Sequence, residues 1–223
     1  MDRIKLLIFD WDGTLADSAA QIVRAMQSAI ADLGLPARSD ASIRELIGLG
    51  LDEGLRRLYP ELELGALRSL LDGYRAKWLA EGGGEAPLFA GALAAVHALH
   101  REGFRIAIAT GKSRRGLARS LRHHADLARV IVNSRCADET ASKPDPRMLV
   151  ELLEDEGLKP EEALMIGDTE YDMAMARAIG MTGLGVACGV HEPARLLRAG
   201  ASAVIDAVAD VPSWLSAAHT RAA

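Results

Sequence analysis

Aromatic side chains are scarce in this chain, because Phe, Trp and Tyr together make up only 4% of its 223 residues. We therefore expect an aliphatic core rich in alanine, since 49% of the residues are hydrophobic. Cysteine is also rare. Cys136 and Cys188 lie far apart without the spacing of metal ligands, so we expect free thiols in a reducing cytoplasm.

Long hydrophobic runs and an excess of positive charge are absent as well. No stretch has the length of a membrane span, and the apolar run at residues 4–9 is too short for a signal peptide. The formal net charge is −5 and no basic stripe occurs, so nucleic acid is not an expected partner. A site for an anionic ligand must then be positive locally. We expect a cytoplasmic monomer or homodimer without membrane or nucleic-acid partners.

Two carboxylates follow this apolar run, Asp10 directly and Asp12 two residues later, and Gly13 comes next. The run is short and partly β-branched, which indicates a buried strand of a parallel sheet. Ligands of such sheets bind beyond the carboxyl ends of the strands. Two carboxylates there can hold Mg²⁺ with a substrate phosphate, or one can attack phosphorus while the other transfers protons. The alternative is a solvated Asp-Gly turn.

The stretch Asp10-Trp11-Asp12-Gly13-Thr14-Leu15 resembles the first motif of the haloacid dehalogenase superfamily in its phosphatase form. The resemblance implies that Asp10 is the nucleophile and Asp12 the acid and base. The dehalogenases of that superfamily lack the second Asp. Thr14 is expected to help position Asp12 and to lie at the phosphate.

The rest of the chain divides into two patterns. Residues 16–86 contain only helical periodicity, with an N-cap at Asp17-Ser18 and a glycine-rich connection at the end. Strands and helices alternate after it, which indicates an α/β fold with a doubly wound parallel sheet. The expected strands are 105–109, 130–132, 163–166, 183–187 and 203–205, the helices between them are 91–102, 114–124, 146–156, 170–179 and 192–199, and a last short helix lies in 207–223. We therefore expect a Rossmann-like core of residues 1–15 and 87–223 with an inserted helical cap, residues 16–86.

Thr110-Gly111-Lys112-Ser113 follows the strand predicted at 105–109. A hydroxyl residue and glycine between a strand and a helix can bind phosphate through the Thr110 hydroxyl and the free N–H groups of the helix. Gly111 and Lys112 are further candidates for this phosphate site. The alternative is that Ser113 caps the helix and Lys112 is solvated. Thr110 is similar to the superfamily's second motif, a Thr or Ser at a strand end.

Lys143-Pro144 precedes the helix predicted at 146–156. Such a lysine is usually solvated. In the superfamily, a lysine at this place neutralises the nucleophile and the phosphoryl group, so the resemblance implies that role for Lys143.

Asp168 and Asp172 follow the strand predicted at 163–166. Their spacing of one helical turn can direct two carboxylates at one cation. The alternative is that Asp168 is the N-cap of the next helix. The pattern Gly167-Asp168-x-x-x-Asp172 is similar to the superfamily's fourth motif, which completes its Mg²⁺ site.

These motifs occur in the superfamily's order, and the resemblance spans residues 4 to about 187, with most similarity to the phosphoglycolate phosphatase-like branch. It implies a Mg²⁺ ion held by Asp10, Asp168 and the backbone oxygen of Asp12, with Asp172 acting directly or at one remove. The expected substrate is a small phosphorylated metabolite, such as phosphoglycolate or a sugar phosphate, hydrolysed through an aspartyl-phosphate.

The cap is expected to act as a lid hinged near residues 15–17 and 82–84. Arg44 and Gly48 are the candidates for its surface facing the pocket, although Gly48 and Gly50 can equally be a helix break. The roles of Arg114, Arg115 and His191 stay open at this level.

Other functions remain compatible with the motifs. A phosphomutase or a pyrophosphatase would use the same aspartyl-phosphate. A phosphonate hydrolase is less favoured, because Lys77 is the cap's one candidate for an imine lysine. A non-catalytic binding module is the alternative from another class, but every expected catalytic residue is present.

Overall fold

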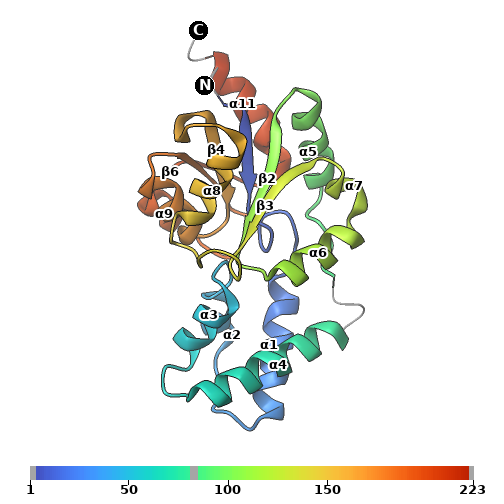
Figure 1. The fold of residues 1–223 in the computed structure, drawn as a ribbon, viewed down its shortest axis with the longest axis vertical. Coiled ribbons are helices and arrows are strands. Elements are labelled where there is room, and N and C mark those ends of the chain that lie inside the picture. The colour runs from blue at the N-terminus through green and yellow to red at the C-terminus, as the bar shows by residue number, and fades with distance from the viewer. Residues whose placement is uncertain (1–3, 81–84, 221–223) are drawn as a thin grey trace.

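A six-stranded parallel sheet forms the centre of the molecule, with strand order β3-β2-β1-β4-β5-β6 (Figure 1). This computed structural model describes residues 4–80 and 85–220. The strands are β1 (Leu6–Phe9), β2 (Arg105–Thr110), β3 (Ile131–Cys136), β4 (Ala163–Gly167), β5 (Thr182–Val186) and β6 (Ala201–Ile205). The predicted α/β class with a doubly wound parallel sheet is confirmed.

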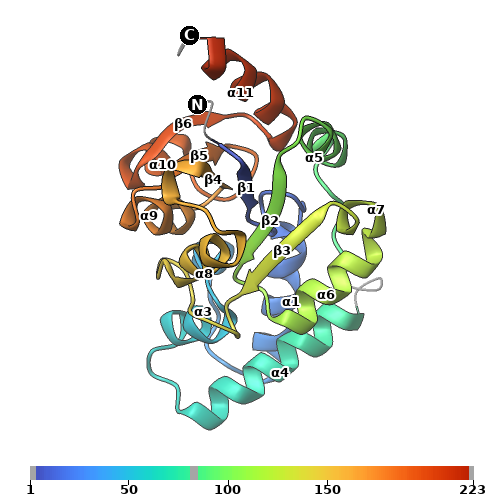
Figure 2. The same cartoon turned by 45° about the horizontal axis from the view of Figure 1, so that its top comes forward.

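The helices fall into two groups (Figures 1 and 2). Between β1 and β2 lie α1 (Ala19–Asp32), α2 (Asp40–Arg44), α3 (Leu51–Leu58) and α4 (Leu64–Ala80). Around the sheet lie α5 (Ala92–Arg101), α6 (Arg114–His123), α7 (Ala125–Ala128), α8 (Arg147–Glu156), α9 (Glu170–Ala178), α10 (Pro193–Ala199) and α11 (Val211–Thr220). None of the helices within the described ranges combines the length and the apolar character needed to cross a lipid bilayer.

Both faces of the sheet are buried, because successive side chains of a strand point to opposite faces. Leu7 and Phe9 of β1 pack with Leu99 of α5 in one apolar cluster. Leu6 and Ile8 of β1 pack in a second cluster on the other face, with Met148, Leu149, Leu152 and Leu153 of α8. The strand is therefore fixed from two sides, and its carboxyl end is held in place.

The helices α1 to α4 form a separate lobe beyond the carboxyl ends of the strands (Figure 1). This lobe has its own apolar core, formed by Val23, Met26, Ala29, Ile30, Ile43, Leu55, Leu58, Tyr59, Leu67, Leu70 and Leu71. Its two connections to the core run side by side, because Ala16 and Leu88 form an antiparallel bridge. The Asp17 N–H donates to the Pro87 carbonyl oxygen at 2.9 Å in the same joint. The expected second hinge at residues 82–84 lies outside the described residues.

The strand β3 is longer than the sequence predicts, since it continues to Cys136 rather than ending at Val132. Its second half, Asn133 to Cys136, is mostly polar and gives no apolar pattern. β3 lies at the edge of the sheet and pairs only with β2, so polar side chains can reach solvent there. Arg135, for example, forms ion pairs with Glu151 and Asp155. The short helix α7 was also not predicted.

We expect Leu70→Ala to lower the free energy of unfolding by about 2–5 kcal/mol, because Leu70 of α4 is fully buried and its loss leaves a cavity. Leu64→Ala in the same helix is the matched control, since Leu64 is 55% exposed and its loss should change stability by less than about 0.5 kcal/mol. Chemical denaturation measures both. Equal effects of the two substitutions would show that the lobe lacks the described core.

Candidate active site

The carboxyl ends of β1 and β4 bring two of the expected site residues together. Phe9 of β1 is paired with Ile166 of β4, and the Asp10 N–H donates to the Ile166 carbonyl oxygen at 2.9 Å. Asp10 and Asp168 are the first residues after β1 and β4, so they lie at neighbouring strand ends. The neighbouring, parallel strands make this contact between residues that are far apart in sequence.

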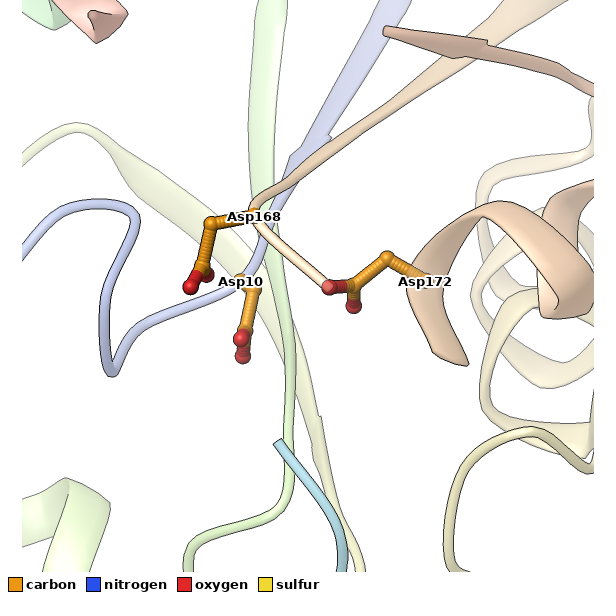
Figure 3. A group of neighbouring side chains, drawn as sticks. All are labelled: Asp10, Asp168 and Asp172. Atoms are coloured by element: carbon orange, nitrogen blue, oxygen red, sulfur yellow. The ribbon is translucent and has the colours of Figure 1, made fainter. Parts of the chain in front are cut away.

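Asp10, Asp168 and Asp172 form one acidic group (Figure 3). Each offers a carboxylate oxygen within 4.8 Å of the others, and all three residues are buried. Asp10 and Asp168 follow strands, whereas Asp172 lies in the first turn of α9. The structure thus brings together three of the four expected metal-binding residues by their side chains.

Lys143 provides the positive charge of this group. Its Nζ atom lies 2.8 Å from Asp10 Oδ1 and 2.6 Å from Asp172 Oδ1, and its side chain is fully buried. Burial opposes the charged ammonium, but the adjacent charges of Asp10 and Asp172 outweigh that effect and raise the pKa of Lys143. The lysine is therefore not the solvated loop residue of the alternative interpretation.

One lysine does not balance three carboxylates. Burial raises the pKa of Asp10 well above its ordinary value, against the lowering effect of Lys143, and repulsion from Asp172 and Asp168 adds to it. Burial and the charge of Asp172 raise the pKa of Asp168 to about 7, although hydrogen bonds from Thr14 and from the Val190 N–H oppose this rise. The site therefore favours either a bound proton or a bound cation.

Asp10 is the carboxylate whose oxygens lack hydrogen-bond donors among the described residues. Both of its carboxylate oxygens are buried and accept no hydrogen bond from the residues that the structure describes, although the Lys143 ammonium lies 2.8 Å from Oδ1 as an ion-pair partner. Buried polar atoms of this kind are rare and require a partner. A small cation with oxygen ligands, such as Mg²⁺, fits these oxygens and those of Asp168 and Asp172.

Asp12 lies apart from the acidic group and has other partners. Lys112 Nζ is 3.0 and 3.1 Å from its two carboxylate oxygens, and Ser18 Oγ donates to Asp12 Oδ1 at 2.7 Å. Lys112 is therefore not merely solvated. Ser18 was expected to cap α1, but its side chain accepts no capping hydrogen bond.

Thr14 holds Asp168 rather than Asp12, which corrects the expectation from sequence. Its hydroxyl donates to Asp168 Oδ1 at 2.7 Å, and Thr14 is fully buried. The chain turns back at Gly13, which has a φ of +87°. A Cβ atom on Gly13 would lie 2.3 Å from Asp168 Oδ2, so only glycine allows this approach.

Asp168 is not the N-cap of α9, so that alternative is wrong. Thr169 is the cap, and its side chain accepts from the Asp172 N–H. Asp172 in turn accepts hydrogen bonds from the Thr169 N–H at 3.1 Å and the Thr169 hydroxyl at 2.6 Å. This capping box fixes the direction of Asp172 and leaves Asp168 facing Asp10.

A cavity of about 720 Å³ lies between the lobe and the carboxyl ends of the strands. Its lining on the core side includes Asp10, Asp12, Thr110, Gly111 and Lys112. Asp10 and Asp12, the expected nucleophile and acid, therefore line the same cavity as the expected phosphate-binding residues.

The loop at residues 47–50 of the lobe contacts the core side of the cavity. A Cβ atom on Gly111 would lie 2.3 Å from the Leu49 carbonyl oxygen and 2.6 Å from that of Gly48, so the loop passes directly over Gly111. The Gly50 N–H donates to Ser142 Oγ of the core at 2.7 Å. Gly48 lines the cavity and is more than a helix break.

Arg44 is exposed and does not line the cavity, in contrast to the expectation from sequence. Its neighbour Glu45 instead connects the lobe to the core. Arg195 of α10 binds Glu45, with Nη1 donating at 2.8 Å, and also binds Glu170 of α9. The Tyr171 hydroxyl donates to the Glu45 carbonyl oxygen at 2.9 Å. We call these contacts of Glu45 the lobe–core clamp.

The three residues whose roles were left open have different surroundings. Arg114 is engaged by the protein, since its guanidinium donates to Glu139 and Ser134. Arg115 is exposed and lines the cavity. His191 is buried and its Nδ1 accepts from the backbone N–H of Glu170 at 3.0 Å, so it supports α9 rather than the cavity.

Tyr74 and Trp78 of α4 are site residues that the sequence interpretation missed. Their spacing in the sequence is that of an apolar helix face packed in a core, yet both line the cavity. The Trp78 ring centroid lies 5.0 Å from Lys112 Nζ, which is a cation–π contact between the lobe and the partner of Asp12. An aromatic pair at i and i+4 near a helix end was the only available signal.

Comparison with known proteins shows the family of this chain. Residues 7–186 match the family of haloacid dehalogenase-like hydrolases. The phosphoglycolate phosphatase of Rhodospirillum rubrum is 32% identical over 221 residues, which cover 95% of this chain and 90% of that protein. The plasmid-encoded phosphoglycolate phosphatase of Cupriavidus necator is 30% identical, with 96% of this chain and 94% of that protein covered.

Solved structures share the whole fold. A hydrolase from Pseudomonas syringae superposes with a TM-score of 0.84 at 27% identity, covering 95% of this chain and 98% of that one. A haloacid dehalogenase-like family hydrolase from Streptococcus pneumoniae has a TM-score of 0.82 at 25% identity, covering 96% of this chain and 100% of that one. The acidic group, the buried lysine and these similarities lead to one conclusion: the chain belongs to the haloacid dehalogenase-like hydrolases, in the branch that contains the phosphoglycolate phosphatases.

Proposed function

We propose that this chain is a Mg²⁺-dependent phosphatase that hydrolyses small phosphomonoesters through an aspartyl-phosphate on Asp10. The observation that carries the proposal is the state of Asp10, whose buried oxygens accept no hydrogen bond from any described residue and whose Oδ1 lies 2.8 Å from Lys143 Nζ. The relatives from Rhodospirillum rubrum and Cupriavidus necator are both named phosphoglycolate phosphatases, which supports the same reaction class.

Asp10, Asp168 and Asp172 would hold the metal ion with carboxylate oxygens. When bound, Mg²⁺ would offset the negative charges of the substrate phosphate and of Asp10, which otherwise repel each other. Thr14 acts as a positioning residue in this arrangement, because its hydrogen bond fixes one oxygen of Asp168.

Asp10 attacks phosphorus with a carboxylate oxygen, and the bond between phosphorus and the leaving oxygen breaks. For this step Asp12 must carry a proton, which it gives to that oxygen so that a neutral alcohol leaves. The ionised Asp12 then takes a proton from the water that cleaves the aspartyl-phosphate, which restores its starting state. Lys143 stabilises the negative charge near Asp10, while the Thr110 hydroxyl binds a phosphate oxygen. The Arg114 and Gly116 N–H groups at the start of α6 already donate to Asp138 and Ser113, so they are not the phosphate donors expected from sequence. Lys112 and Ser18 hold Asp12 towards the leaving group.

The lobe acts as a lid over this site. Its loop at residues 47–50 contacts the core at Gly111, and the lobe–core clamp adds a second contact between lobe and core. Movement about the paired connections at Ala16 and Leu88 would admit substrate and release product.

Asp10→Asn should reduce phosphate release by at least about 10³-fold, because the amide cannot act as the nucleophile. Asp17→Asn is the matched control, since Asp17 is exposed and outside the acidic group. The assay measures phosphate released from phosphoglycolate, sugar phosphates, pyrophosphate and alkyl phosphates, with Mg²⁺ or with excess chelator. Wild-type turnover by Asp10→Asn, or release that survives the chelator, would refute the proposed mechanism.

Mg²⁺ should raise the melting temperature more at pH 8 than at pH 5.5. Without metal, a carboxyl whose pKa rises to about 7, as in Asp168, favours its protonated form in the folded state. Its contribution to stability is therefore lost as the pH rises through 7, and the cation restores it by binding the ionised form. Each added kcal/mol corresponds to about 2–4 °C for a chain of this size.

Differential scanning fluorimetry at the two pH values measures this difference, and Asp168→Asn should remove most of the Mg²⁺ effect. An equal Mg²⁺ shift at both pH values would contradict the assignment of the acidic group as the metal site.

Glu45→Gln should raise KM for a phosphomonoester by about 2- to 5-fold at low salt, because the closed lobe loses an ion pair worth up to about 1 kcal/mol. Glu61→Gln is the matched control, since Glu61 pairs with Arg38 within the lobe. The difference between the two variants should shrink at high salt. If both substitutions affect KM equally, the lobe–core clamp does not control closure.

A further inference from the structure

The cavity above the acidic group is much larger than a phosphoryl group requires. Its volume of about 720 Å³ is within the range of pockets that enclose drug-sized molecules. A phosphoryl group with a two-carbon acid would fill only a small part of this space. The remaining volume is available to the leaving group of the substrate.

The wall on the lobe side is mostly apolar, and its charged members are Asp52, Glu53, Arg56 and Arg75. It includes six apolar side chains that the lobe leaves partly or largely exposed, namely Ile22, Leu46, Leu51, Tyr74, Trp78 and Leu79. Leu79 alone is 53% exposed. Contiguous apolar surface in a concave site marks the place where an apolar ligand binds.

This wall lies next to Asp12, the residue proposed to protonate the leaving oxygen. Lys112 contacts Asp12 at 3.0 Å on one side and the Trp78 ring at 5.0 Å on the other. The Tyr74 and Trp78 rings are neighbours, with centroids 6.2 Å apart. Burial and the charge of Asp12 raise the pKa of Tyr74, which agrees with their proximity. A leaving group whose oxygen is protonated by Asp12 would therefore have the two aromatic rings beside it.

Recognition of a short anionic leaving group is poorly provided for near Asp12. Lys112 is already paired with Asp12, and Arg119 is paired with Glu85. The other arginines that line the cavity are exposed to solvent, namely Arg56, Arg75, Arg115 and Arg122. A carboxylate in this cavity would thus have to pair with one of these exposed arginines, because Lys112 and Arg119 already have acidic partners.

We propose that the substrate of this chain is the phosphomonoester of an apolar alcohol with a ring-sized body, which lies against Tyr74 and Trp78. This inference rests on the proposed phosphatase function and specifies its substrate class. It departs from the phosphoglycolate substrate that the names of the relatives suggest.

The test compares 2-phenylethyl phosphate, ethyl phosphate and phosphoglycolate with the wild-type protein and Mg²⁺. The two alkyl phosphates have leaving groups of similar basicity, so their ratio of kcat/KM reports contacts with the ring. We expect a ratio of at least about tenfold in favour of 2-phenylethyl phosphate, because burying several apolar carbons is worth at least that factor. We also expect it to exceed phosphoglycolate.

Variants locate the preference. Trp78→Ala should bring the ratio of the two alkyl phosphates towards one, and Ile22→Ala, on another helix of the wall, should lower it by a smaller factor. Trp214→Ala is the matched control, because Trp214 packs on the core of the sheet and does not line the cavity. It should leave the ratio unchanged.

The outcomes separate the two proposals. Release from ethyl phosphate or phosphoglycolate without a preference for the phenyl compound would overturn the substrate class and leave the phosphatase function intact. A ratio unaffected by both Trp78→Ala and Ile22→Ala would also overturn it. No release from any of the three compounds would overturn the phosphatase function and this inference together.

Discussion

Electrostatic imbalance is the constraint on which the site depends, because three buried carboxylates share one buried lysine at the end of the sheet. A protein can tolerate such a group only if protons or a cation complete it. The fold holds the imbalance in place by rigid means. Asp10 and Asp168 leave strands that are buried on both faces, and a capping box fixes Asp172. Asp12 lies outside this acidic group, and its carboxylate is bound by Lys112 and Ser18.

The strands and the acidic group could be predicted from sequence because their determinants are local. An apolar run followed by a polar residue defines a strand end, and parallel strands bring their ends to one edge. The partner of Thr14 could not be predicted in the same way. The turn at Gly13 directs Thr14 to Asp168, a residue 154 positions away in sequence. The contact of Lys112 with Asp12 spans 100 positions and depends on how β1 and β2 lie side by side.

The prediction of site residues was weakest in the lobe, because the sequence of a short helix does not show which of its faces is buried. The helix α2 has only five residues, so its sequence does not determine which side faces the core. Arg44 was assigned to the pocket, yet the neighbouring Glu45 makes the contact and Arg44 is exposed. Trp78 illustrates the complementary limit. Helical spacing identifies an apolar face, but it does not distinguish a face that packs in a core from one that lines a cavity.

The antiparallel bridge between Ala16 and Leu88 has a consequence for how such a chain can change over time. The lobe enters and leaves the core at one point, through two backbone segments held together by hydrogen bonds. A segment joined in this way can be replaced, lengthened or redesigned as a unit while the strand ends stay where they are. The lobe, which determines selectivity, can therefore evolve independently of the strand ends, which carry the reacting groups. A lobe transferred from another protein would bring a new specificity to the same reacting groups.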